Sequence, residues 1–268
     1  MRKYIPWLKS HPSVSVVRMS GVIASGGRFG STLSDAGIAP LLDKAFKKGK
    51  PAAVALIINS PGGSPVQSSL IGARIRRLAD ETDTKVYAFC EDVAASGGYW
   101  LACAADEIYV DPSSVVGSIG VISASFGFTG LMEKHGVERR VHTAGVDKSM
   151  MDPFRPERAE DVERLKDLQR VIHDNFIDHV KARRGDKLAD RDLFTGEIWV
   201  GAKAIDEGLV DGIGHLVPFM QEKFGKDVKL NVQGQKKSLM QRFGIHAAVG
   251  DAVAAVEDQA LWAQYGVK

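Results

Sequence analysis

The amino-acid sequence predicts an α/β fold in which a mostly parallel β-sheet is layered with helices. Short apolar, β-branched segments alternate with segments of helical periodicity through the first two thirds of the chain. The composition fits a globular protein, because 44% of the residues are hydrophobic and 25% are charged. A chain of 268 residues also suffices to bury a substantial core. A disordered chain, a fibrous repeat and a disulfide scaffold are therefore excluded.

The first two thirds of the chain alternate between strands and helices. Ser34 is expected to cap a helix that ends at Gly49. The segment Ala52–Ile58 is continuously apolar, as expected of a strand buried on both faces, and a helix follows from about Pro65. The other elements expected here are the strands Val14–Ile23, Lys85–Cys90, Glu107–Val110, Ser118–Ser123 and Glu138–Thr143 and the short helix Ala94–Ala105.

The longest helix is expected over Pro156–Arg184, with Pro156 in the first turn and Gly185 at its end. Its apolar residues form one stripe, and its dense mixed charges are expected to face the solvent. The stripe consists of Val162, Leu165, Leu168, Val171, Ile172, Phe176, Ile177 and Val180. After a strand at Asp227–Val232, the Ala-rich segment 236–268 is expected to form a helical extension of a domain over residues 1–235. That extension would pack on the domain or on a neighbouring subunit.

Charge and cysteine content narrow the class of protein. Thirty-five basic residues against 33 acidic ones leave a net charge of +2, so no nucleic-acid partner is expected. Cys90 and Cys103 lie in apolar segments, which favours buried thiols over a disulfide. No apolar run approaches the ~20 residues that span a bilayer, and no signal peptide is expected. We therefore expect a cytoplasmic protein, and the basic, aromatic stretch Met1–Lys9 leaves open peripheral contact with a membrane surface.

Glycine is over-represented, with 28 residues, and two glycine-rich turns each follow an expected buried strand. In Asn59–Ser64 the backbone amides precede a helix and form a candidate oxyanion site, although a tight turn alone would also explain the glycines. This turn lacks the Lys-Ser/Thr pair of a phosphate loop and the glycine spacing of a dinucleotide fingerprint. Asp92–Tyr99 places Ser96 at a strand-to-helix turn, as in the nucleophile elbow of serine hydrolases. A helix cap is the alternative interpretation of Ser96.

A serine nucleophile needs a general base. His135 and His142 are the best placed of the seven histidines, but neither has an acidic partner in the sequence. Lys148, in a loop before the long helix, can serve instead if burial leaves it neutral. The adjacent Asp147 would oppose that shift if it lay close to the amine, and an exposed loop lysine is the alternative.

Taken together, five segments resemble the signal peptide peptidase A family, which are serine peptidases with a Ser–Lys dyad. The segments occur in the family's order and span roughly residues 13 to 215. They are Asn59–Ser64, Ala94–Tyr99, Val116–Val121, the Lys148 loop ending in Pro153, and Thr195–Gly196 followed by Ala204–Gly212. By this resemblance Ser96 is the nucleophile, Lys148 the general base, and Ser118 the residue that orients the lysine. The amides of Gly63 and Gly97 match the oxyanion hole.

The resemblance also implies a crotonase- or Clp-protease-like layered β-β-α core and a ring- or dome-shaped homo-oligomer. In some members neighbouring subunits complete the sites. The implied activity is that of a serine endopeptidase, without metal or organic cofactor, acting on apolar or unfolded peptides such as remnant signal peptides. Many members begin with a membrane anchor, and none is expected in this sequence.

Three other functions are compatible with parts of this pattern. A crotonase-type acyl-CoA hydratase or isomerase would use two backbone amides to polarise a thioester. It would need neither Ser96 nor a lysine ~50 residues later. A non-catalytic relative would use the groove to bind peptides or to assemble. A phage-head maturation protease is a related alternative, although nothing in the sequence marks a capsid context.

Overall fold

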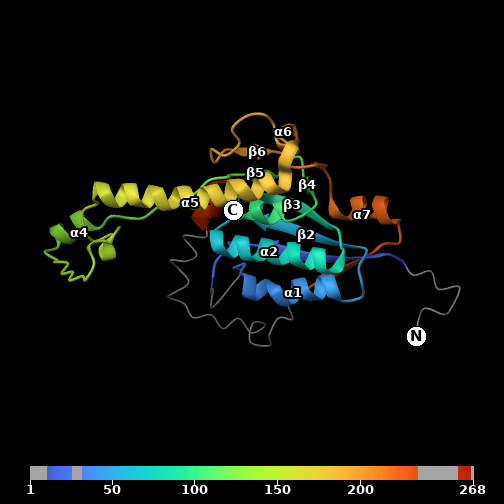
Figure 1. The fold of residues 1–268 in the computed structure, drawn as a ribbon, viewed down its shortest axis with the longest axis horizontal. Helices are drawn as coiled ribbons and strands as arrows, with labels where there is room; N and C mark the ends of the chain where they lie inside the picture. Colours follow the sequence, from blue (N-terminus) through green and yellow to red (C-terminus); the bar gives the residue numbers. More distant parts are fainter. Residues whose placement is uncertain (1–10, 26–31, 235–258, 267–268) are drawn as a thin grey trace.

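The strands and helices alternate along the chain largely as the sequence predicts (Figure 1). The computed structural model describes residues 11–25, 32–234 and 259–266. The strands are β1 (Ser13–Ser20), β2 (Ala53–Ser60), β3 (Val86–Ala95), β4 (Glu107–Val110), β5 (Val115–Gly117), β6 (Ile198–Val200), β7 (Gly212–Ile213) and β8 (Lys229–Gln233). The helices are α1 (Asp35–Lys47), α2 (Pro65–Thr82), α3 (Gly97–Cys103), α4 (Thr129–Lys134), η2 (Val146–Ser149), α5 (Ala159–Arg184), η3 (Gly185–Lys187), α6 (Ala202–Asp206) and α7 (Leu216–Phe224).

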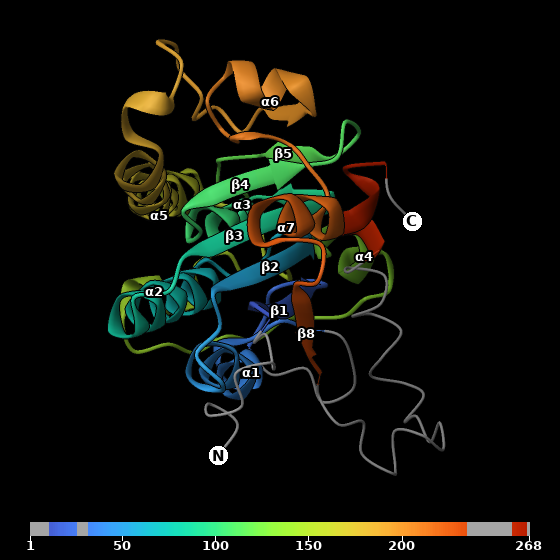
Figure 2. The ribbon, with the colours of Figure 1, turned by 90° about the vertical axis from the view of Figure 1, so that its right-hand side faces the viewer.

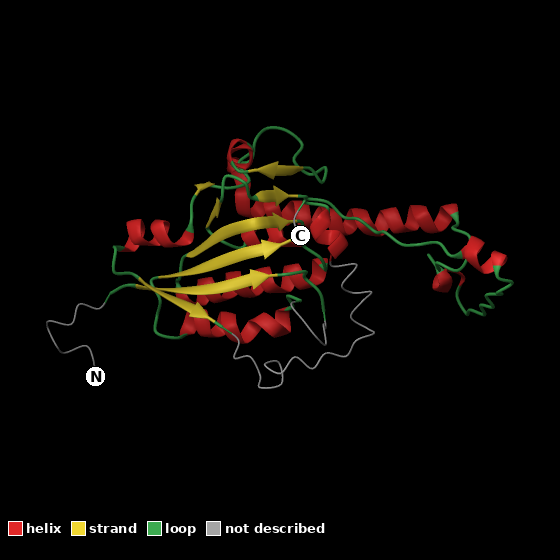
Figure 3. Cartoon of the chain, turned by 180° about the vertical axis from the view of Figure 1, so that it is seen from behind, coloured by secondary structure: helices red, strands yellow, loops and turns green. Residues whose placement is uncertain are grey.

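Eight strands form one sheet in the order β6-β5-β3-β2-β1-β8, with β4 paired to β3 and β7 to β4. The described strands pair in parallel except for β5 and β6, so the predicted mostly parallel sheet is confirmed. Figure 3 shows that the long central strands point to the same edge of the sheet. In sheets of this kind, ligands bind in the crevice outside the carboxyl ends of the strands.

Helices cover both faces of the sheet, because alternate residues of each strand point to opposite sides. In β2, Val54, Leu56 and Ile58 belong to the larger core, which also contains residues of α1, α2, α3 and α5. Ala53 and Ala55 belong to a smaller core with Met220 of α7. Figure 2 shows α7 on the opposite side of the sheet from α1 and α2.

The starts of the first two helices follow local capping rules. Ser34 accepts a hydrogen bond from the amide of Gly37, so the predicted N-cap is confirmed. Ser64 caps α2 in the same way, and Pro65 occupies the first turn, where its missing N–H costs nothing. This cap places the glycine-rich turn directly between the end of β2 and the start of α2.

Two predicted strands are wrong, and a third is longer than expected. Ser118–Ser123 is not a strand, because Gly117 (φ 100°) and Ser118 (φ 52°) turn the chain out of the sheet after β5. Glu138–Thr143 has strand-like residues, but it lies in an irregular segment and pairs with none of the strands that the structure describes. β3 continues past the expected end at Cys90 because its last residues pair with β5, and α3 therefore starts later than predicted.

The long helix α5 is only partly buried. Of the predicted apolar stripe, Phe176 and Val180 are buried, whereas Leu168 is 50% and Val171 62% exposed. The reason is visible in Figure 1, where the N-terminal half of α5 extends beyond the sheet edge. Residues 121–158, which we call the arm, lie at that end and include α4 and η2. The helix begins at Ala159, and it ends at Gly185 as predicted.

Several expectations concern cysteines, membranes and the chain ends. Cys90 and Cys103 are buried and unpaired as predicted, and burial raises the pKa of the Cys103 thiol to about 12. Within the described ranges, no helix is long and apolar enough to cross a membrane. The stretch Met1–Lys9 and residues 236–258 of the expected extension lie outside the described residues. Residues 259–266 include a short helical turn beside the carboxyl edge of the sheet.

Candidate active site

Ser96 lies in the turn between β3 and α3. Its backbone adopts φ 51° and ψ −121°, a conformation that L residues rarely occupy. The Ser96 amide donates to the Gly117 carbonyl (2.8 Å), and the Trp100 amide donates to the Ser96 carbonyl (3.0 Å). The Ser96 side chain makes no capping hydrogen bond to α3, which does not fit the helix-cap interpretation. This is the backbone geometry of a nucleophile elbow, with the serine at a strained strand-to-helix turn.

Ser118 occupies the matching position on the neighbouring strand. β3 and β5 pair in parallel with Ala95 opposite Gly117, so Ser96 and Ser118 are the next residues along adjacent strands. Adjacent strands lie about 4.8 Å apart. The Ser118 amide donates to the Glu197 carbonyl (2.7 Å), which fixes the turn after β5. The fold therefore holds two serine residues side by side at the carboxyl edge of the sheet.

Two backbone amides lie beside Ser96. A Cβ atom on Gly62 would lie 2.8 Å from both the Gly97 nitrogen and the Ser96 Cβ, so the two glycine-rich turns are in close contact. The Ile23 amide donates to the Gly62 carbonyl (2.8 Å) and fixes the first turn. In the parts of the chain that the structure describes, neither the Gly63 nor the Gly97 amide donates a hydrogen bond. Unpaired amide donors beside a serine are the arrangement that stabilises an oxyanion.

A small pocket of about 20 Å³ brings these groups together. Its apolar walls come from α3, α5 and the start of the arm. The pocket is lined by Gly63, Pro65, Ser68, Ser96, Gly97, Trp100, Gly120, Val121, Ile172 and Phe176. In the single chain it has room for about one water molecule.

Helix α5 fixes one wall of this pocket through two histidines. Trp100 stacks on Phe176 (ring centroids 5.0 Å apart) and on His179 (4.6 Å). Burial lowers the pKa of His179, and its neutral ring donates from Nε2 to the Trp100 carbonyl (3.1 Å). His173 Nε2 lies 3.0 Å from the Ile119 carbonyl, next to Ser118. The sequence predicts no role for these two histidines, and their helical spacing to Phe176 is the only signal that points to them.

Lys148 is not in a desolvated pocket beside Ser96 within one chain, where sequence reasoning expected it. Its side chain is exposed on η2 of the arm. The adjacent Asp147 pairs with Arg164 of α5 (2.6 Å), whereas the pocket beside Ser96 borders Ile172. From Arg164 to Ile172 the helix axis rises about 12 Å. The arm therefore carries the lysine away from the serine of its own chain.

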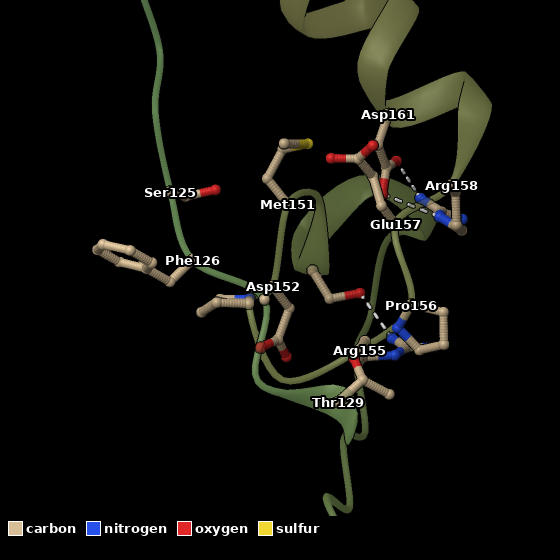
Figure 4. Close-up of a pocket in the computed structure, with 13 residues that line it drawn as sticks. Ser125, Phe126, Thr129, Met151, Asp152, Arg155, Pro156, Glu157, Arg158 and Asp161 are labelled. Atoms are coloured by element: carbon tan, nitrogen blue, oxygen red, sulfur yellow. Dashed lines mark hydrogen bonds and ion pairs between the residues drawn. The ribbon is translucent and has the colours of Figure 1, made fainter. Parts of the chain in front are cut away.

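The arm has internal contacts and a pocket of its own (Figure 4). This pocket of about 420 Å³ lies between the start of the arm and the start of α5. Arg158 pairs with Asp161, and Arg155 Nη1 donates to Ser149 Oγ (3.0 Å). Phe128 stacks on Phe154 with ring centroids 5.4 Å apart. The Phe128–Phe154 contact links the segments before and after η2, so the arm has a defined structure around Lys148.

The other candidate bases lie in the same region. His135 and His142 are both exposed on the arm. Neither has a hydrogen bond or an ion pair to an acidic side chain among the described residues. Among the residues that the structure describes, no group of three or more His, Cys, Asp or Glu residues could hold a metal ion.

Sequence reasoning also missed one contact to Ser118. The hydroxyl of Tyr265, in the segment 259–266, donates to Ser118 Oγ (3.2 Å). No motif marks this tyrosine, because the contact depends on how the end of the chain returns to the sheet.

Comparison with protein families identifies one match that spans most of the site. The profile of peptidase family S49 matches residues 79–229, more than half of the chain. The matched range contains Ser96, Gly97, Ser118 and Lys148.

Three curated relatives illustrate the range of names among similar proteins. The "Na(+)/H(+) antiporter NhaA" of Brucella melitensis is 51% identical over 271 residues, which cover 95% of this chain and 37% of that protein. A "Putative signal peptide peptidase SppA" of Enterococcus faecium is 34% identical over 65% of this chain and 49% of that protein. The "Probable protease SohB" of Haemophilus influenzae is 34% identical over 72% of this chain and 55% of that protein. The chain thus spans between 37% and 55% of the length of these relatives.

Among solved structures, a mutant of the 1510-N membrane-bound stomatin-specific protease in complex with a substrate peptide is similar in fold. The TM-score is 0.52 at 13% identity, over 88% of this chain and 97% of that chain. The predicted Clp- and crotonase-like layered fold is confirmed by this likeness.

Proposed function

The chain belongs to peptidase family S49, and on that premise we propose that it is a serine endopeptidase with Ser96 as nucleophile and Lys148 as general base. The Ser96 turn is the observation that carries the proposal. It presents a serine in a left-handed conformation next to the unpaired amides of Gly63 and Gly97. A hydratase that polarises a thioester would use the two amides but has no need of this serine.

The chemistry follows from the groups in the site. Neutral Lys148 accepts the Ser96 proton as Oγ attacks the carbonyl carbon of the scissile peptide bond. The amides of Gly63 and Gly97 donate to the resulting oxyanion, an effect of about 3 kcal/mol per donor in a comparable protease. Lys148 then passes the proton to the leaving amine, and water hydrolyses the acyl-enzyme by the reverse sequence of proton transfers. Ser118 orients the lysine amine by a hydrogen bond.

We propose that Lys148 reaches the site of a neighbouring copy. Within its own chain the lysine is exposed, on an arm that extends away from the sheet. The arm also exposes large apolar side chains, among them Phe126 (80% exposed), Ile122 and Leu131. Exposed apolar patches of this kind commonly mark protein interfaces. A homo-oligomer in which one arm covers the next Ser96 would bury these side chains. It would also withdraw Lys148 from water, as a neutral lysine requires.

The pocket favours apolar substrates. Trp100, Val121, Ile172 and Phe176 form its walls, and all four present apolar surface beside Ser96. An extended peptide with a large apolar residue before the scissile bond fits this surface if the walls move apart, because the single chain leaves little space. Remnant signal peptides are the substrate class we propose, in line with the name of the Enterococcus faecium relative.

A fluorophosphonate probe tests the nucleophile directly. We expect the probe to label the wild type and the control Ser113→Ala, which changes an exposed serine in the turn before β5. We expect no label on Ser96→Ala. Equal labelling of Ser96→Ala and the wild type, or no labelling of the assembled wild type, would show that Ser96 is not an activated nucleophile.

A further inference from the structure

The segment 259–266 lies against one of the two site serines. The Tyr265 hydroxyl donates a hydrogen bond to Ser118 Oγ, with the two oxygens 3.2 Å apart. Figures 1 and 3 show the segment beside the carboxyl ends of the central strands, where Ser96 and Ser118 leave the sheet. The contact joins residues 147 positions apart, so it is a tertiary contact.

The segment is a short helical turn with one side directed at the protein. Backbone bonds run from Gln264 N to the Ala260 carbonyl (3.3 Å) and from Tyr265 N to the Trp262 carbonyl (3.1 Å). Leu261, Trp262 and Tyr265 are half-buried, whereas Gln264 is exposed. Tyr265 follows Leu261 by four positions and Trp262 by three, which places both beside it on one side of a helical turn. The turn therefore approaches the site with its aromatic and apolar side.

The same serine hydroxyl is required by two groups. In the proposed function, which this inference takes as its premise, Ser118 Oγ accepts from the Lys148 amine and orients it. In the structure Ser118 Oγ accepts from Tyr265 instead. A serine hydroxyl has two lone pairs. The Tyr265 hydroxyl takes one of them, and its oxygen at 3.2 Å occupies one approach to Ser118 Oγ.

We propose that the Ser118 side of the site is a binding surface for the segment 259–266, which competes there with Lys148 of a neighbouring copy. In the unassembled chain the turn occupies Ser118, while Lys148 of the same chain lies on the arm away from Ser96. The arriving arm displaces the turn, and Ser118 exchanges the Tyr265 hydroxyl for the Lys148 amine. The recognised partner is thus an aromatic hydroxyl on a short apolar turn, supplied by the chain itself.

The test uses the full chain and two measurements. Hydrogen–deuterium exchange of the amides of 259–266 reports docking and does not depend on catalysis. Peptide turnover reports the competition. The variants are Tyr265→Phe, which keeps the ring, Ser118→Ala for the exchange measurement alone, and Gln264→Ala as the control on the exposed side of the same turn. We expect faster exchange in Tyr265→Phe and Ser118→Ala and no change in Gln264→Ala. We also expect turnover to rise about fivefold in Tyr265→Phe, the factor for one ordinary hydrogen bond.

Each outcome decides one part of the inference. Exchange that is unchanged in both Tyr265→Phe and Ser118→Ala overturns the docking, whatever the enzyme does. Faster exchange without a rise in turnover, in a wild type that is active, overturns the competition while the proposed peptidase stands. Inactivity of all variants and of the wild type overturns the peptidase and the competition together. In that case the exchange measurement still decides whether the turn docks on Ser118.

Discussion

Replacing Gly97 by alanine displaces one donor of the proposed oxyanion hole. Gly97 is the first residue of α3 and is not in a positive-φ conformation, so the backbone itself accepts alanine. The added Cβ would lie 2.4 Å from Ser68 Oγ and 3.1 Å from Ile23 Cδ1. An ordinary contact is about 1 Å longer than the first of these, so one of the two groups must move. Ser68 is fully buried and its hydroxyl bonds to the Ser64 carbonyl (2.9 Å), so we expect the Gly97 amide to shift. Loss of one oxyanion donor lowers kcat by about 10²- to 10³-fold, and overpacking costs about 1–3 kcal/mol of stability.

A second substitution removes the clash. Ser68→Ala removes the oxygen that the new Cβ would meet, and alone it costs little because that hydroxyl bonds only to the preceding turn of its own helix. We expect kcat of the double variant Gly97→Ala/Ser68→Ala to exceed kcat of Gly97→Ala by about tenfold or more. Gly234→Ala, at a glycine with open space around it, is the control. Wild-type kcat in Gly97→Ala, or no recovery in the double variant, would refute the steric reasoning.

Three further predictions concern stability, pH and assembly. Arg184, only 3% exposed, donates to the Gly208 carbonyl (3.0 and 2.8 Å) and to Asp211 (2.8 Å). Arg184→Met should therefore lower the free energy of urea unfolding by about 3–5 kcal/mol, and a loss below ~1 kcal/mol would contradict this. Burial lowers the pKa of His179 in the folded chain. As the pH falls below about 6.5, the unfolded chain therefore protonates this histidine more readily than the folded chain does, which favours unfolding. Stability should fall from pH 7.5 to 5.5 more steeply in the wild type than in His179→Phe, and equal slopes would count against the assignment. Phe126→Ser should reduce the assembly mass in light scattering while thermal unfolding of the single chain is unchanged, and an intact assembly would exclude this part of the arm from the interface.

Most strands of the sheet can be predicted from local signals in the sequence. Ala52–Ile58 was predicted as a doubly buried strand, and β2 occupies Ala53–Ser60, because an apolar run of that length between turn residues leaves few alternatives. Ser34 could be identified as a cap because capping depends on residues within one helical turn. The turn containing Ser96 was likewise located by its neighbours in the sequence.

Features that depend on tertiary structure could not be predicted in this way. The strand expected at Ser118–Ser123 fails because Gly117 and Ser118 adopt positive φ where Trp199 packs beside them. The exposure of Leu168 on α5 depends on where the helix passes the sheet edge, which periodicity does not encode. The separation of Lys148 from Ser96 has the same origin, because the order of two residues along the chain does not determine the direction of the arm between them.

Mixing two inactive variants tests the central claim, that a serine of one copy works with the lysine of the next. Ser96→Ala keeps Lys148, and Lys148→Ala keeps Ser96, so neither assembly alone has a complete site. In an equal mixture assembled at random with a head-to-tail interface, about a quarter of the sites combine both intact groups. We predict that co-assembled mixtures, verified by mass, recover peptide turnover to about 25% of the wild type per site. Co-assembled mixtures that remain as inactive as their parents, or full activity of Lys148→Ala by itself, would contradict the account.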